Sequence, residues 1–216
     1  MEKIHLAKLK AFFKKQKLIS YRKGEVILKP GEELKGVGFV KSGFVRVFLK
    51  TKDGREITLP MFKPLFYFSF IYHLTGMENK YYFETITPVE MWVAPYKECL
   101  KFLKLNTAIS FELFKEVLTC FMEITNNAQK LISGDAYEKV ARLIIYLARR
   151  FGEEEDKTVK IKFFTTHKMI ASITGLTRET VTIQILRLEK EGYIVNKGKR
   201  IVVKNIDKME KAIDER

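Results

Sequence analysis

The C-terminal third of the chain shows two short helical patterns joined by a tight turn. The first pattern stops at Gly175, and the second begins at Thr177, whose hydroxyl suits the N-cap of a helix. Apolar side chains recur at helical spacing in both patterns, which places them on one buried face of each helix. These positions are Met169, Ile170 and Ile173 in the first pattern and Val181, Ile185 and Leu188 in the second. Residues 165–189 therefore predict a helix, a tight turn and a second helix.

The second helix of this pair has a face that its apolar stripe leaves free. At about 100° per residue, Glu179 and Ile183 point away from the stripe, while Arg178 and Thr182 flank it. A DNA-reading helix places its N-terminal residues in the major groove, where Arg binds guanine and Glu accepts from cytosine N4. A plain helical hairpin would show the same apolar pattern, so both interpretations stand on the pattern alone.

Two β-rich segments around a basic turn follow this pair of helices. Ile194-Val195 and 201–203 are short strand patterns, and 197–200 reads Lys-Gly-Lys-Arg between them. The segments 175–181 (GLTRETV) and 188–194 (LEKEGYI) resemble the winged helix-turn-helix of the Crp–Fnr superfamily of bacterial transcription regulators. The strand pair is similar to the wing of that family, whose basic residues touch phosphates.

The resemblance implies a set of DNA contacts in this chain. Arg178 and Glu179 would read base edges, with Thr182 and Ile183 beside them, and Thr177 would start the reading helix. The residues expected near phosphates are Thr166, His167, Lys168, Thr180, Lys197 and Lys199. Many members carry a second base-reading Arg where this chain has Ile183. Because an apolar side chain packs on a thymine methyl but cannot bind guanine O6 and N7, we expect one base pair changed from G·C to A·T or T·A.

The N-terminal half begins with a helix predicted over 4–18, whose apolar face we expect to dock on the following domain rather than on a membrane. From Tyr21, short β segments alternate with glycine-containing turns and predict hairpins that fold into a barrel or roll. These segments are 23–28, 30–32, 36–40, 42–48 and 53–57. Their spacing resembles the cyclic-nucleotide-binding β-roll of the same superfamily.

The nucleotide-binding positions of that roll are altered here. Where the cyclic-nucleotide sensors carry a Gly-Glu-Leu turn and an Arg-Ser/Thr-Ala segment, this chain has 66–69 (FYFS) and 79–81 (NKY), with no Arg between Arg55 and Arg142. A buried phosphate would have little to replace its hydration, so cyclic AMP is not expected.

Cys99 and Cys120 cannot supply the four cysteines of the family's iron–sulfur sensors, and we expect ordinary buried thiols.

Aromatic residues gather over 62–83, and two interpretations compete for them. One is a pocket for an apolar or aromatic effector; the other is a roll filled by its own side chains, which we favour because such clusters are usually core. His73 lacks a partner at a spacing typical of haem or metal ligands. The candidate pocket residues are Phe62, Phe66, Phe68, Tyr72, His73, Tyr81 and Phe83, with Phe121 and Thr125 from the next helix.

A long helix is predicted from 106 or 107, after a helical stretch over 97–105. Its apolar positions step by three and four residues and form a heptad seam: Phe111, Phe114, Leu118, Phe121, Thr125, Ala128 and Ile132. A second stripe (Leu113, Val117, Cys120, Ile124, Leu131) is available to the chain's own β-roll. Two apolar faces favour a parallel homodimer, as the resemblance also implies, over a large monomeric core.

Ser133-Gly134-Asp135 interrupts that helix, and Asp135 with Glu138 predicts a capped restart of a helix over 136–151. An acidic loop at 153–156 leads to the helix-turn-helix. The predicted fold class is α+β: a β-roll (double-stranded β-helix) domain at 1–105, a dimerisation helix and hinge at 106–134, and a winged helix-turn-helix domain at 135–216.

The chain is strongly basic, and the excess of basic residues is concentrated in the predicted helix-turn-helix and wing. The formal net charge is +14, and 157–204 holds 11 basic against 3 acidic residues, which suits a polyanionic partner. No apolar run approaches the ~18 residues of a membrane span, and the N-terminus is too charged for a signal peptide, so a cytoplasmic location is expected. A cupin-type enzyme would need clustered metal ligands, and three scattered histidines (His5, His73, His167) do not supply them.

We therefore expect a non-enzymatic, sequence-specific regulator. The expected partners are double-stranded DNA with a palindromic operator, a second copy of the chain and, as the resemblance implies, RNA polymerase. Whether a small molecule acts as an effector stays open. A helix-turn-helix that binds protein or RNA is the remaining alternative, and the Arg-Glu turn and basic wing disfavour it.

Overall fold

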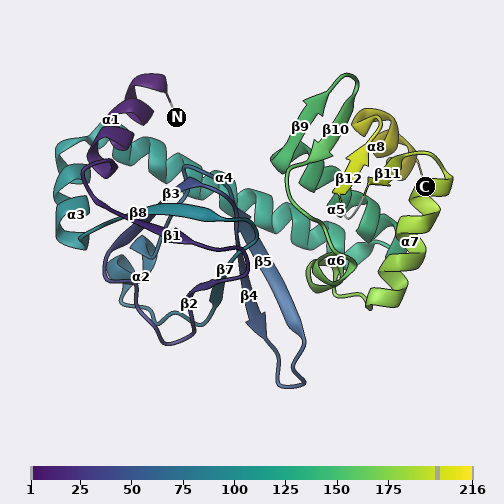
Figure 1. Ribbon diagram of the computed structural model, residues 1–216, viewed down its shortest axis with the longest axis horizontal. Coiled ribbons are helices and arrows are strands. Elements are labelled where there is room, and N and C mark those ends of the chain that lie inside the picture. Colours follow the sequence, from purple (N-terminus) through teal and green to yellow (C-terminus); the bar gives the residue numbers. More distant parts are fainter. Residues whose placement is uncertain (1, 198–199, 216) are drawn as a thin grey trace. The chain divides into compact units, whose positions relative to one another are not determined.

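The computed structural model describes residues 2–197 and 200–215, without the side chains of 123, 124, 126–133 and 197 (Figure 1). It confirms the α+β fold: a β-rich N-terminal domain, then helices, then a C-terminal helix-turn-helix. The chain forms two compact units, residues 1–49 with 59–124 and residues 50–58 with 125–216. Within the described residues, no helix is both long enough and apolar enough to cross a membrane.

Two four-stranded sheets build the N-terminal domain, in the strand orders β1-β8-β3-β6 and β2-β7-β4-β5. Most pairings are non-local, so residues far apart in sequence meet in each sheet. The elements are α1 (Lys3–Phe13), β1 (Lys17–Tyr21), β2 (Val26–Leu28), β3 (Val37–Ser42), β4 (Val45–Lys50), β5 (Glu56–Phe62), β6 (Tyr67–Phe68), α2 (Phe70–Thr75), β7 (Tyr82–Thr85), β8 (Val89–Ala94), α3 (Tyr96–Leu105) and α4 (Thr107–Ser133).

The predicted N-terminal helix is too long at its C-terminal end. α1 ends at Phe13, and residues 17–21 pair with β8 as an antiparallel edge strand. Ile19 and Tyr21 are strand-forming residues, and the ladder to β8 outweighs the helical pattern that continues into 14–18. The docking prediction for this helix is confirmed, because Phe13 is buried and stacks on Phe39 of β3, with ring centroids 4.6 Å apart.

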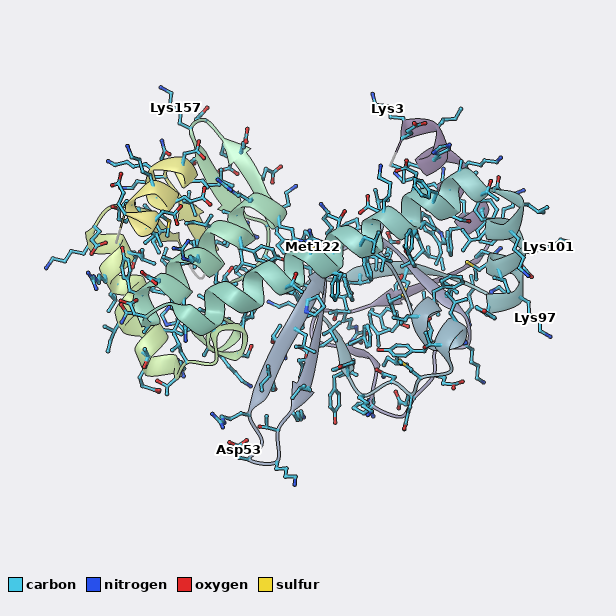
Figure 2. All side chains as sticks on the ribbon, turned by 180° about the vertical axis from the view of Figure 1, so that it is seen from behind. Lys3, Asp53, Lys97, Lys101, Met122 and Lys157 are labelled. Carbon is cyan, nitrogen blue, oxygen red and sulfur yellow. The ribbon has the colours of Figure 1, made fainter. Side chains whose placement is uncertain are left out.

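Only part of the predicted hairpin order is correct. β4 and β5 are neighbours around a turn at 51–55, with Asp53 at the tip (Figure 2). β3 and β4, in contrast, belong to different sheets, so the turn between them crosses from one sheet to the other. Gly43 makes this turn with φ +87°, and a Cβ there would lie 2.1 Å from the carbonyl oxygen of Pro88. The glycine spacing shows where the chain turns but not which sheet it joins.

The C-terminal domain contains one four-stranded sheet of order β11-β12-β10-β9. Its first helix begins at the predicted cap, since Asp135 Oδ1 accepts from the backbone N–H of Glu138 at 2.8 Å. The acidic segment expected as a loop is instead largely strand β9, which pairs with β10. The elements are α5 (Ala136–Phe151), β9 (Gly152–Glu155), β10 (Thr158–Ile161), α6 (His167–Thr174), α7 (Arg178–Lys190), β11 (Ile194–Lys197), β12 (Arg200–Val203) and α8 (Ile206–Asp214).

Candidate nucleic-acid interface

The helix–turn–helix pair is built by two threonine caps and one glycine. Thr166 Oγ1 accepts from the backbone N–H of Met169 at 3.2 Å, which fixes the start of α6. Gly175 ends α6 with φ +71°, a left-handed conformation that glycine adopts without strain. Thr177 Oγ1 then accepts from the N–H of Thr180 at 3.1 Å and starts α7. The predicted helix, tight turn and helix are thereby confirmed.

One face of α7 is buried and the opposite face is open. The predicted stripe is confirmed, with Val181, Ile185 and Leu188 each at most 1% exposed. Arg178 and Glu179 are exposed in the first turn, and Ile183 is 62% exposed. Leu186, which the sequence-based site does not include, is also 59% exposed. At 100° per residue Leu186 lies beside Ile183, so the open face carries an apolar pair next to the charged first turn.

Two threonine hydroxyls on α7 are engaged inside the motif. Thr182 Oγ1 donates to the carbonyl oxygen of Arg178 at 2.9 Å and lies 2.8 Å from Nδ1 of His167. The hydroxyls of Thr177 and Thr180 are 2.9 Å apart. Thr182 therefore connects α6 to α7 through a side-chain hydrogen bond.

Three of the residues expected near phosphates lie at the start of α6, while Thr180 lies in the first turn of α7. Thr166 and Lys168 are exposed, and His167 is half-buried. The first N–H groups of a helix have no intrahelical acceptor, so this end favours an anion. Lys168 is 76% exposed, and its Nζ lies 3.5 Å from Oε1 of Glu56, which belongs to the same compact unit. A weak surface ion pair of this kind exchanges readily with a phosphate.

The wing is described in part. β11 and β12 pair antiparallel, with Lys197 opposite Arg200, which confirms the two predicted strands. The side chain of Lys197 and the whole of Lys199 lie outside the described residues. Arg200 adds a basic group that the sequence-based site lacks, and its guanidinium lies 5.1 Å from the ring centroid of Phe164. The sequence did place Arg200 in a basic turn.

In the β-roll, most of the aromatic candidates pack on one another. The ring centroids of Phe62 and Phe66 are 3.6 Å apart, and those of Phe68 and Phe83 are 5.3 Å apart. Phe62, Phe68 and Phe83 are at most 7% exposed and share one apolar cluster. Tyr72 and Tyr81 pack against this cluster, and burial raises the pKa of Tyr72. Six of the nine candidate pocket residues thus share one packed cluster.

The other three candidates lie elsewhere. A ring nitrogen of His73 lies 3.3 Å from the carbonyl oxygen of Gly36, and its ring centroid is 4.9 Å from that of Tyr96. Phe121 and Thr125 are exposed on α4. The structure therefore does not gather all nine residues in one cluster.

Two side chains in the segments that match the nucleotide-binding positions, Ser69 and Asn79, make hydrogen bonds to the protein backbone. Ser69 donates its hydroxyl proton to the carbonyl oxygen of Gly36 at 2.6 Å. The amide of Asn79 donates to the carbonyl oxygens of Lys29 and Tyr81, at 2.7 and 2.9 Å, and accepts from the N–H of Tyr81 at 3.0 Å. Asn79 is only 3% exposed. Both side chains therefore connect their own segments to distant parts of the chain.

Helix α4 presents an apolar strip to solvent in the single chain. The large apolar seam members that are described, Phe111, Phe114, Leu118 and Phe121, are 64%, 57%, 48% and 60% exposed. Met122 beside them is 56% exposed (Figure 2). The seam positions Ala128 and Ile132 fall outside the described side chains, as do Ile124 and Leu131 of the second stripe. Within that stripe Leu113 is buried and its carbonyl oxygen accepts from the Tyr67 hydroxyl at 3.0 Å, whereas Val117 is 47% exposed. The predicted packing of the second stripe is wrong at Val117.

The two cysteines differ in their environments. Cys99 is buried in the cluster that joins α1, α3 and α4, and desolvation raises the pKa of its thiol to about 12. Cys120 is only half-buried. The expectation of two buried thiols is therefore correct for Cys99 and wrong for Cys120.

Comparisons with known proteins bear on both domains. A family model described as a Crp-like helix-turn-helix domain matches residues 138–212, and one described as a cyclic nucleotide-binding domain matches residues 18–106. A global nitrogen regulator of Nostoc sp. (strain PCC 7120) is 25% identical over 186 residues, which cover 85% of this chain and 83% of that protein. A CRP-like cAMP-activated global transcriptional regulator of Mycobacterium tuberculosis is 24% identical over 200 residues, 92% of this chain and 89% of that protein.

A solved structure agrees with these relatives. A CRP/FNR-family transcriptional regulator from Thermus thermophilus aligns with a TM-score of 0.72 and 25% identity, over 92% of this chain and 98% of that one. The similarity covers both the roll and the helix-turn-helix, so it concerns the whole architecture and not one domain.

Proposed function

Because this chain belongs to the Crp–Fnr family of transcription regulators, we propose that it binds a palindromic operator as a homodimer, with helix α7 of each subunit in a major groove. The chain is a regulator with a DNA-binding helix-turn-helix and not an enzyme. The proposal adds the dimer, the symmetry of the site and the roles of individual residues.

The observation that carries the proposal is the two-sided character of α7. Its apolar stripe is fully buried, while Arg178, Glu179 and Ile183 project from the open face. Arg and Glu in the first turn suit guanine and cytosine edges, and Ile183 with Leu186 offers apolar surface to thymine methyls. The α6 N-terminus and Lys168 supply the phosphate contacts that set the register of α7 on the duplex.

The apolar strip on α4 supports the dimer. Four large apolar side chains at heptad spacing are about half exposed or more in the single chain, which a soluble monomer rarely tolerates on one helix. A parallel partner helix would cover Phe111, Phe114 and Leu118 at once. The two-fold symmetry of such a dimer matches two half-sites ~34 Å apart on DNA.

The roll supports a regulator that is active without cyclic AMP. Ser69 and Asn79 are held by backbone partners, and the interior is filled by Phe62, Phe68 and Phe83. None of these side chains offers a positive charge or a free hydrogen-bond donor that would replace the lost hydration of a buried phosphate. We therefore propose that the ligand-free dimer binds DNA, without cyclic AMP, haem or an iron–sulfur cluster, and that RNA polymerase is its partner at promoters.

The test is a selection from random duplexes with the purified ligand-free protein at near-physiological salt, followed by sequencing. We expect a palindromic motif whose half-site centres are about one helical turn apart. Sedimentation of Phe114→Glu beside the control Lys115→Glu on the same helix would show whether the α4 strip holds the dimer. A motif without two-fold symmetry would refute the homodimeric reader, and no enrichment would refute binding by the ligand-free protein.

A further inference from the structure

One side-chain hydrogen bond links the two helices of the reading motif. His167 is the first residue of α6, and its Nδ1 lies 2.8 Å from Thr182 Oγ1 on α7. The same hydroxyl oxygen lies 2.9 Å from the carbonyl oxygen of Arg178, one turn earlier on α7. The three groups form a chain from the imidazole through the hydroxyl to the backbone.

Only one placement of protons satisfies both contacts. The carbonyl oxygen of Arg178 is an acceptor, so the single hydroxyl proton of Thr182 must point to it. Thr182 Oγ1 is then an acceptor toward His167, and Nδ1 must carry a proton. If Nδ1 accepted instead, two oxygen acceptors would face each other at 2.9 Å without a proton. The neutral imidazole is therefore fixed as the Nδ1–H tautomer.

This tautomer leaves the second ring nitrogen without a proton. Nε2 of His167 has no hydrogen-bond partner among the described residues and is not one of their buried, unpartnered nitrogens, so it reaches solvent. It lies in the first turn of α6, where the free N–H groups favour a phosphate. A neutral Nε2 is an acceptor and meets a phosphate oxygen without a proton between them, whereas a protonated Nε2 donates a charge-assisted hydrogen bond.

We infer that His167 and Thr182 make DNA binding proton-dependent: each subunit takes up one proton at Nε2 of His167 when a backbone phosphate docks on the start of α6. This rests on the proposed DNA-binding function and adds a regulating condition to it. Thr182 is a positioning residue here, because its hydroxyl blocks the other tautomer, in which a neutral Nε2–H could donate to the phosphate. Its methyl group remains available beside the bases.

The charged groups around the pair do not replace this proton. On α6, Lys168 can leave Glu56 of the 50–58 segment for a phosphate, but its ammonium group does not place a proton on Nε2 of His167. Arg55 and Asp53 of that segment pair with each other. On α7, Arg178 and Glu179 are neighbours of opposite charge in the first turn. Helix α5 also packs on α6, and its Arg142 and Arg149 pair with acidic residues of α8.

The experiment measures the affinity of the full-length protein for its selected duplex between pH 6 and pH 8, at fixed salt. We expect the wild-type association constant to fall with rising pH by roughly tenfold per subunit, the scale of one hydrogen bond to a charged group. His167→Gln should lose this pH dependence. His5→Gln, on α1, removes another histidine as a matched control and should keep it.

The threonine separates a proton-directing role from a merely structural one. Thr182→Val keeps the shape but removes the hydroxyl, so His167 can adopt the Nε2–H form; the variant should lose pH dependence and bind at pH 8 at least as tightly as wild type. Thr182→Ser should restore the wild-type profile. A purely structural threonine would instead predict weaker binding by Thr182→Val at every pH.

Long-range ¹H–¹⁵N correlation NMR of the imidazole determines the tautomer of His167 in the free protein. We expect Nδ1–H at neutral His167 in wild type and Nε2–H in Thr182→Val, and Nε2–H in wild type would overturn the inference. Tight binding that does not change with pH, or that changes equally in His167→Gln, would also overturn it and leave the DNA-binding proposal intact. Absence of binding already at pH 6 would refute both.

Discussion

The helix-turn-helix (α6 and α7) and the β-roll both keep the family's architecture. They differ in whether the side chains at the family's functional positions are exposed or engaged within the protein. On α7, Arg178 and Glu179 stay exposed above a buried stripe, free to contact a ligand. In the roll, the positions that match the nucleotide-binding segments are held by hydrogen bonds such as Ser69 to Gly36, and aromatic rings fill the interior. The side chains on the open face of α7 are available to a partner, whereas those of the roll contact other parts of the roll.

This difference underlies the proposal that the chain keeps the fold of a cyclic-nucleotide-binding domain without binding cyclic AMP. A core of Phe62, Phe68 and Phe83 stabilises the roll through buried apolar area, which a nucleotide pocket would otherwise leave hydrated. In the proposed dimer, the apolar strip of α4 would hold the two subunits together whether or not the roll binds a ligand.

The largest effect on stability should follow from removing a buried aromatic side chain from the roll. Phe83 is 4% exposed and packs on Phe62 and Phe68, so Phe83→Ala should lower the free energy of unfolding by about 3–5 kcal/mol. Chemical denaturation at fixed protein concentration measures it. Ile183→Ala, on the exposed face of α7, is the control and should stay within about 0.5 kcal/mol of wild type. A cost near that of the control would mean that the roll has room for an effector.

On the reading side, Arg178→Ala should weaken binding to the selected operator by about 1–3 kcal/mol, with a much smaller loss on random DNA. The expected cause is the loss of one bidentate contact to guanine, because the side chain is exposed. Competition binding against random duplex measures the difference. Arg187→Ala on the same helix is a matched control, since Arg187 pairs with Glu191 inside the domain. Equal losses on both DNAs for Arg178→Ala would exclude base reading.

Periodicity predicted α3 to α7 well because each depends on local spacing, whereas α1 was predicted too long and α2 and α8 were not predicted. The α6–α7 pair, its threonine caps and the Asp135 restart all follow from residues within a few positions of one another. The strand at 17–21 did not follow, because it depends on β8, which lies far along the chain at Val89–Ala94. The sheet change at Gly43 is non-local in the same way.

Site prediction from the sequence succeeded for exposure and fell short for side-chain partners. The helical wheel gave the open face of Arg178, Glu179 and Ile183, but it gave no indication that Thr182 bonds to His167 of another helix. Leu186 could have been found from the same wheel, since it lies three residues after Ile183. The pocket candidates of the roll are close in sequence, yet the fold places some of them in separate contacts.

A change in preference, with little change in total affinity, should follow from Ile183→Arg. The side chain at 183 is exposed, so the substitution should not disturb the core, and the new guanidinium can bind guanine O6 and N7. We expect one symmetry-related base pair of the operator to change from A·T or T·A to G·C, with discrimination of about 1–3 kcal/mol at that position. Repeating the duplex selection with the variant measures it, and unchanged preference at every position would refute the role of Ile183.

The smallest effect should appear on the packed side, as a one-proton change in alkaline stability. Burial raises the pKa of Cys99 to about 12, above its ordinary value near 9, so the folded state keeps the thiol protonated while the unfolded chain ionises. Its contribution to stability is fully present below about pH 9 and falls as the pH rises from there toward 12. In denaturation series between pH 8 and 10, Cys99→Ala should lose stability less steeply than wild type by about 1 kcal/mol over the series. Cys120→Ala, which removes the half-buried thiol, is the matched control and should keep the wild-type slope. Parallel slopes for wild type and Cys99→Ala would show that this part of the N-terminal core is open to solvent.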